Sequence, residues 1–263
     1  MTPPGFHTPP GARVGMIHQP HFLPWPGYVA RCMAADLVVM LDNVKFNKGY
    51  YHNRTKYIAF DGRETWLTLP VSAKSHSGLL ADVEVTSDFR VRPWQRRFHE
   101  AYGRLPAYEL IWPPVVKLIQ RYAPRLVDVN VATLTALLKL LCAAVDRSMP
   151  PIALGSQLPE SLDRSTRLRD IAVAYELTHL LMGADALQAH DLTPLESAGV
   201  TLLTHSHLSS AYHATESDSA RTAPPHSGVT VLHGMIRRGV EATAQSLCNE
   251  WIVQPFVPYT ENI

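Results

Sequence analysis

Short apolar runs alternate along the chain with longer segments in which apolar residues recur at helical spacing. An unbroken apolar run is typical of a strand buried on both faces of a sheet, and spacing of three and four residues is typical of a helix. The expected strands are 14–17, 37–41, 56–60, 65–71, 82–86, Ile152–Leu154, His179–Met182 and 200–203. The expected helices are 28–35, 94–105, 112–122, 133–146, 165–177, 229–236 and 241–251, with Ser165 as an N-cap.

This order of elements predicts an α/β fold, a mixed sheet with flanking helices and a helical insertion in the middle of the chain. We expect residues 1–12, rich in proline and glycine, to form a disordered tail. Residues 13–263 then form a single α/β catalytic domain, in which 90–148 is a helical sub-region.

Composition narrows the class of protein. The chain has 263 residues, 46% hydrophobic and 18% charged, with a formal net charge of +1, which argues against disorder and against general nucleic-acid binding. No apolar run approaches the roughly 20 residues of a bilayer span, and the N-terminus lacks the pattern of a signal peptide. Three widely spaced cysteines (Cys32, Cys142 and Cys248) argue against a disulfide framework. We therefore expect a cytoplasmic protein.

Polar residues follow the first two expected strands directly. His18 and Gln19 come after 14–17, where neighbouring prolines restrict the backbone, and Asp42 comes just after 37–41. In open α/β sheets, ligands bind beyond the carboxyl ends of the strands. His18 and Gln19 are therefore candidate catalytic residues, the alternative being a hydrogen bond that only holds the loop.

Three segments within the first 71 residues, IHQPHFLPWPGY, LDNVKFNKGYYHNRTKY and WLTLPV, resemble in content and order the WbqC-like proteins. The resemblance continues more weakly through RLRDIA (167–172), THLL (178–181), Asp191 and AGV (198–200). Members are associated with O-antigen clusters that contain aminoacylated amino sugars and with antibiotic clusters.

The nearest role that the resemblance implies is that of the lincosamide condensing enzymes. It implies a transferase that moves an aminoacyl group from a carrier-protein thioester to the amine of an amino sugar. The implied partners are an aminoacyl-loaded carrier protein and an amino-sugar acceptor, with no cofactor and no metal.

Such chemistry requires a base, oxyanion donors and, on a covalent route, a thiolate. Cys32 lies near the start of an expected helix, where the thiol pKa is lowered, and His179 and Asp191 complete a possible Cys–His–Asp arrangement. Gln19 would donate to the oxyanion, by analogy with papain-like cysteine proteases. The alternatives are a Cys32 that is simply part of the core, and direct aminolysis with His18 or His179 as base. His190 is a further candidate base.

The candidate substrate-binding residues are Trp25, Asp42, Asn53 and Arg54. Arg54 offers a bidentate fork to a carboxylate, while the alternative for Asp42, Asn53 and Arg54 is a salt bridge that holds the 44–55 loop. Trp25 is either a pocket wall or core. A candidate docking patch for the acidic carrier consists of Arg90, Arg92, Arg96 and Arg97.

Two other classes of function remain open. His18-x-x-His21 resembles the HxGH of nucleotidylyltransferases and Ser165-Thr166-Arg167 their second phosphate-binding segment, although Pro20 stands where that motif has glycine. The polar 44–55 loop also suits a non-catalytic sugar-binding partner in a biosynthetic complex. For His205, His207 and His213 we expect a solvated strand end and no metal.

Overall fold

The structure is a computed structural model that describes residues 6, 8–74, 78–86, 91–161, 163–183, 186–187, 190–207 and 228–256. The strands are β1 (Val14–His18), β2 (Leu37–Met40), β3 (Arg54–Ile58), β4 (Glu64–Thr68), β5 (Ile152–Leu154), β6 (His179–Met182), β7 (Thr201–His207) and β8 (Trp251–Pro255). The helices are α1 (Pro26–Ala34), α2 (Val91–Tyr102), α3 (Tyr108–Tyr122), α4 (Leu126–Ala143), α5 (Arg164–Ala174), α7 (Thr193–Ser197), α8 (Leu232–Arg238) and α9 (Val240–Asn249). Short 3-10 turns are η2 (Leu80–Asp82) and η3 (Gly155–Gln157).

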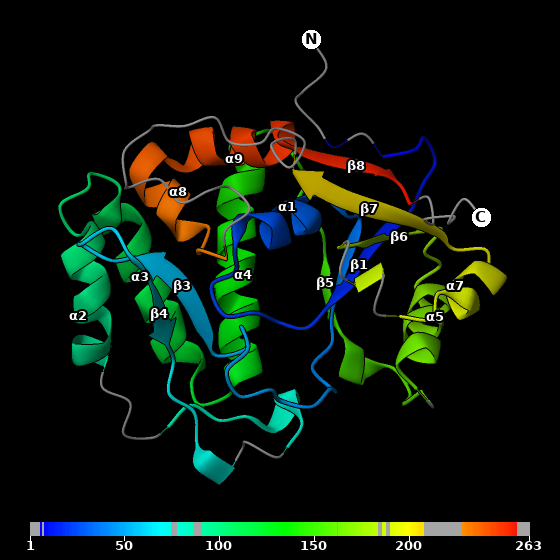
Figure 1. The fold of residues 1–263 in the computed structure, drawn as a ribbon, viewed down its shortest axis with the longest axis horizontal. Coiled ribbons are helices and arrows are strands. Elements are labelled where there is room, and N and C mark those ends of the chain that lie inside the picture. Colours follow the sequence, from blue (N-terminus) through cyan, green and yellow to red (C-terminus); the bar gives the residue numbers. More distant parts are fainter. Residues whose placement is uncertain are drawn as a thin grey trace, which may run out of the picture.

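A six-stranded sheet in the order β5-β2-β1-β6-β7-β8 forms the centre of the molecule (Figure 1). All neighbouring pairs are parallel except β7–β8, which is antiparallel. The chain builds outward from β1 through β2 to β5 and then crosses to β6 on the other side of β1. The α/β class with a mixed sheet is thereby confirmed, and the order of the strands reverses between β1 and β6.

Helices cover both faces of the sheet. Successive side chains of each strand point to opposite faces, so both faces carry apolar residues that must be buried. Val14 and Met16 of β1 belong to the main core with α1, whereas Leu180 of β6 packs with Leu168 and Ile171 of α5 on the opposite face. α1 and α5 therefore lie on opposite faces of the sheet and on either side of the reversal.

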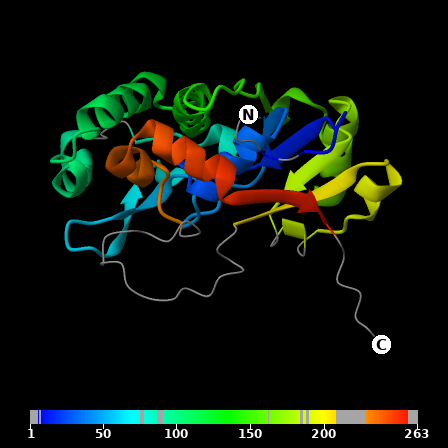
Figure 2. The same cartoon turned by 90° about the horizontal axis from the view of Figure 1, so that it is seen from above.

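The central helical segment α2–α4 is also confirmed. α2 and α3 lie with the β3–β4 hairpin at one end of the molecule, α5 and α7 lie at the other, and α4 lies between them (Figures 1 and 2). The hydroxyl of Tyr102 connects three elements, since it accepts a bond from the Ile58 N–H (3.1 Å) and is hydrogen-bonded to Nδ1 of His233 (2.9 Å). α4 is long and apolar enough to span a membrane by length and composition, but ten of its 18 residues are buried, as in the core helix of a globular protein.

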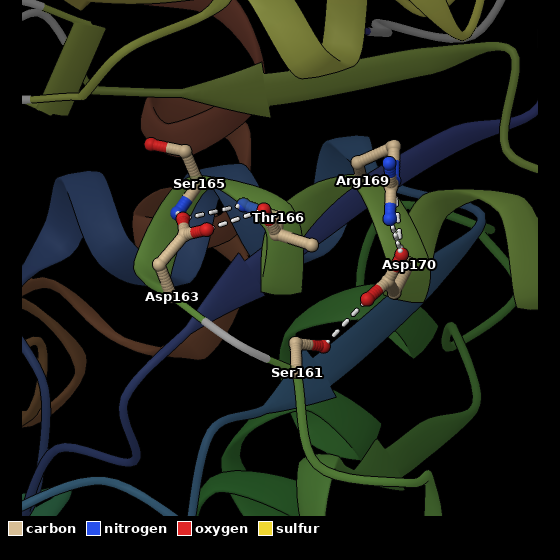
Figure 3. Close-up of polar contacts among 6 residues, drawn as sticks. All are labelled: Ser161, Asp163, Ser165, Thr166, Arg169 and Asp170. Atoms are coloured by element: carbon tan, nitrogen blue, oxygen red, sulfur yellow. Dashed lines mark hydrogen bonds and ion pairs between the residues drawn. The ribbon is translucent and has the colours of Figure 1, made fainter.

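Several expected boundaries were wrong. α4 begins at Leu126, residues 82–86 form only isolated bridges after η2, and β8 was not expected. Ser165 does not cap α5; Asp163 does, because its carboxylate accepts from the N–H groups of Ser165 and Thr166 (Figure 3).

Part of the tail expected to be disordered is described. Phe6 is 7% exposed, and its ring lies 6.1 Å from that of His205 in β7. Residues 1–5 and 7 lie outside the described residues, so disorder there stays a prediction.

We expect the substitution Tyr102→Phe to lower the free energy of unfolding by about 2 kcal/mol, because it leaves the Ile58 N–H and the His233 Nδ1 buried without a partner. Urea denaturation checks this value. Tyr122→Phe is the control, since Tyr122 is 39% exposed at the end of α3. Equal stability of the two variants would contradict the role of the buried hydroxyl.

Candidate functional site

A cavity of about 550 Å³ opens at the carboxyl ends of β1, β2 and β6, where the strand order reverses. The position is the one at which open α/β sheets bind ligands, since the crossover helices on opposite faces leave a crevice between them. The residues that carry its polar chemistry are His18, Gln19, Arg31, Asn43, Lys45, Asn47, Asp163, Arg164, Arg167 and His190.

His18 ends β1 and presents a neutral imidazole to the cavity. Burial, followed by the charge of Arg31, lowers the pKa of His18 to about 3. Its Nδ1 lies 3.0 Å from the carbonyl oxygen of Gln19. A carbonyl can only accept, so the proton resides on Nδ1 and Nε2 retains a lone pair.

The side chain of Gln19 is oriented by His52. Nδ1 of His52 accepts from the backbone N–H of Asn47 (3.3 Å), so its Nε2 carries the proton and donates to Oε1 of Gln19 (2.9 Å). The amide nitrogen of Gln19 is then left as a donor, and none of the described residues accepts from it. His52 is fully buried, and burial lowers its pKa to about 4, which keeps the ring neutral.

The cavity has a basic lining. Arg31, Lys45, Arg164 and Arg167 supply cations, and Asp163 is the only carboxylate among the described lining residues. Asp163 is already engaged as the cap of α5 and also accepts from the Thr166 hydroxyl (Figure 3). The electrostatics therefore favour an anionic ligand.

The structure does not present Cys32 as a nucleophile. The residue is fully buried in α1, and its thiol contacts Sδ of Met16 at 3.4 Å. Burial raises the pKa of the Cys32 thiol far above its ordinary value, and Cys32 is not among the described cavity residues. The expectation from helix position fails because the side chain faces the sheet rather than the helix start.

The expected Cys–His–Asp arrangement is not assembled. His179 begins β6 and is in register with Val14 at the start of β1, about 13 Å along the strand from the end at which His18 lies. Its Nδ1 contacts the Thr178 hydroxyl at 2.8 Å. Asp191 is exposed and accepts from the Thr193 N–H (3.0 Å) in the turn that precedes α7, whose N-cap position is Leu192.

The four expected substrate-binding residues are not among the described residues that line the cavity. Asp42 is 1% exposed and accepts from the N–H and hydroxyl of Ser156, while Asn53 donates to the Leu69 carbonyl. The guanidinium of Arg54 stacks on Trp66 at 3.8 Å, and Trp25 packs 6.5 Å from Trp251. These contacts fit the alternative in which the four residues hold the structure together better than a role in substrate binding. The salt bridge expected in that alternative is replaced by hydrogen bonds and stacking.

The other histidines and the arginine patch are placed as follows. His205 and His207 are each 6% exposed and pack on Trp251, so the expectation of a solvated strand end was wrong for both.

His213 and Arg90 lie outside the described residues, as does the side chain of Arg92. Arg96 pairs with Glu100 on α2, while Arg97 is exposed. Among the described residues no group of three or more potential ligands could hold a metal.

Sequence reasoning missed several cavity residues. Asn43, rather than Asp42, faces the cavity, and the Lys45 side chain follows on the same loop. Arg31 and Arg164 gave no signal beyond their charge. His52 was inside the quoted YYHNRT segment, but its partner Gln19 is 33 residues away.

The fold and cavity define a doubly wound α/β protein with a basic cavity at its switch point. The chain belongs to the WbqC-like protein family, whose model matches residues 19–219. No curated protein and no solved structure matches the chain.

Buried neutral histidines should make the protein sensitive to acid. The pKa is lowered to about 3 for His18 and His205 and to about 4 for His52 and His233, in each case mainly by burial. Since the unfolded chain binds these protons near pH 6.5, stability is complete above that pH and is lost as pH falls toward 4. We expect the free energy of unfolding to fall by at least about 2 kcal/mol from pH 7 to 5. Urea titrations at pH 7, 6 and 5 measure this, and a constant value would contradict the assignment of neutral rings.

Proposed function

We propose that this protein is an amide-forming acyltransferase of the cytoplasm that moves an aminoacyl group from a carrier-protein thioester to the amine of an amino sugar. Family membership supports the general assignment. The observation that carries it is the pairing, at one cavity, of the His18 lone pair with the free amide donor of Gln19. These are the base and the oxyanion donor that aminolysis requires.

The proposed reaction is direct aminolysis. The amine nitrogen attacks the thioester carbon, a C–N bond forms, and the carbonyl oxygen gains the negative charge that the Gln19 amide N–H stabilises. Nε2 of His18 takes the proton from nitrogen. When the C–S bond breaks, the thiolate receives that proton and leaves as a thiol, and the products are the amide and the unloaded carrier.

The low pKa of His18 suits the second half of this reaction. An imidazolium with a pKa near 3 is a strong acid and returns its proton readily to the departing thiolate. An anionic ligand beside Arg31 would offset that cation's effect and so raise the pKa of His18, making it a better base when substrate is bound.

Substitutions at His18 and Cys32 test the route. With an aminoacyl-loaded carrier protein and an amino-sugar acceptor, we expect His18→Asn to lower kcat by about 10²- to 10⁴-fold. Cys32→Ala should retain the rate within about threefold and lose only about 1 kcal/mol of stability, since it removes one small buried group. Amide product is measured by liquid chromatography with mass spectrometry.

The opposite result would be decisive. An acyl adduct on the wild-type protein that disappears in Cys32→Ala, with loss of amide formation, would overturn direct aminolysis. Full activity of His18→Asn would remove His18 as the base.

One observation favours a second candidate, nucleotidyl transfer. If the strands of the six-stranded sheet are counted in chain order, without the β3–β4 hairpin, the parallel ones lie in the order 3-2-1-4-5, which is that of dinucleotide-binding folds. Arg167 of the Ser165-Thr166-Arg167 segment lines the cavity. His21, however, is sandwiched between Tyr28 and Tyr51 and is not among the described cavity residues.

A product assay with ATP, magnesium and sugar phosphates separates the two candidates. Under the acyltransferase proposal, saturating ATP with magnesium yields no nucleotidylated product from any sugar phosphate tested. Formation of pyrophosphate in proportion to product would establish nucleotidyl transfer instead.

A further inference from the structure

Three cations of the cavity have no carboxylate partner in the described part of the chain. They are Lys45, from the loop after β2, and Arg164 and Arg167, which are one turn apart on α5. Their spacing of three residues places the two arginines on the same face of the helix. Like charges gathered in this way repel one another unless an anion lies between them.

The nearby acidic groups on α5 do not neutralise these cations. Asp163 caps the helix, and Asp170 is held by Arg169 and by the hydroxyl of Ser161 (Figure 3). Arg169 is therefore paired, whereas Arg164 and Arg167 are not among the ion pairs of the described residues.

Three residues that line the same cavity carry a buried polar atom without a partner in the described part of the chain. Nε of Arg167, Oδ1 of Asn43 and Nδ1 of His190 are buried and have no hydrogen-bond partner among the described residues, and all three residues line the cavity. Each such atom costs free energy in an empty site, so native proteins seldom leave them unpaired. Asn43 and Arg167 also border a second cavity beside η3, so the three cations of the larger cavity, rather than these atoms, indicate the ligand.

We propose that Lys45, Arg164 and Arg167 form a phosphate-binding subsite. Guanidinium groups bind phosphate oxygens bidentately, and a lysine adds a point charge. The cavity extends from these cations to His18 and Gln19, so one substrate bound by its phosphate would reach the proposed base and oxyanion donor. The subsite rests on the proposed function, in which the phosphate is that of the carrier's phosphopantetheine arm; in the second candidate it belongs to a nucleotide.

The apolar rim fits a substrate of this kind. Tyr50 and Leu79, both 42% exposed, line the cavity together with Val44. They offer an apolar surface to the part of the molecule between its phosphate and its reacting end.

Isothermal titration calorimetry on the full chain tests the subsite with four probes: 4′-phosphopantetheine, pantetheine, ATP and adenosine. The variants are Arg164→Gln and Arg167→Gln. Arg169→Gln is the matched control, since it lies on the same helix, is paired with Asp170 and is not among the described cavity residues. Thermal melting of each variant establishes that it is folded.

We expect 4′-phosphopantetheine to bind at least about tenfold more tightly than pantetheine. Arg167→Gln and Arg164→Gln should each remove most of that difference, Arg169→Gln should retain it, and added salt should weaken binding. If ATP binding is weakened by the same arginine substitutions while phosphopantetheine does not bind, the phosphate-binding subsite stands and the phosphate that it binds is that of a nucleotide.

Equal affinity for the phosphorylated and unphosphorylated probes, no binding of any probe, or binding that folded Arg164→Gln and Arg167→Gln leave unchanged would overturn the subsite. The amide assay on the same preparations separates this from the proposed function. Phosphate-dependent binding without amide formation would refute the function alone, and amide formation with an unaltered KM in both arginine variants would refute the subsite alone.

Discussion

The reversal of strand order between β1 and β6 is the constraint on which the site depends. Because β1 is central, its neighbours are reached by crossovers that run in opposite directions along the sheet, and their helices α1 and α5 cover opposite faces. No crossover helix can close the carboxyl end of the sheet at that point. A cavity is therefore a consequence of topology, and the residues that follow β1, β2 and β6 line it.

Within this frame, hydrogen bonds determine what the cavity offers chemically. The chain of contacts from the Asn47 N–H through His52 to Gln19 assigns each donor and acceptor without ambiguity, because it begins at a backbone donor. It joins the loop after β2 to the loop after β1, so the two loops that contribute most polar groups hold one another in place. The neutral state of His52 is essential, since a protonated ring could not accept from Asn47.

The sequence contained enough information to predict β1, β2 and β6 and to place His18 and Gln19 at the end of β1. Unbroken apolar runs marked β1, β2 and β6, and polar residues beside proline marked the end of β1. It did not show which of Asp42 and Asn43 faces the cavity, because β2 ends at Met40 and the direction of each later side chain depends on contacts with η3 more than 100 residues away. β8 was obscured because its Trp251 continues the apolar spacing of α9.

Cys32 illustrates the limit of reasoning from helix position alone. The N-terminus of a helix lowers a thiol pKa only where the thiol points toward the free N–H groups and remains partly solvated. Cys32 is the seventh residue of α1 and faces the Met16 side chain of β1, so the cost of burying a thiolate exceeds any benefit from the helix. His18, at the carboxyl end of the same strand as Met16, lines the cavity and is the residue that we propose as the base.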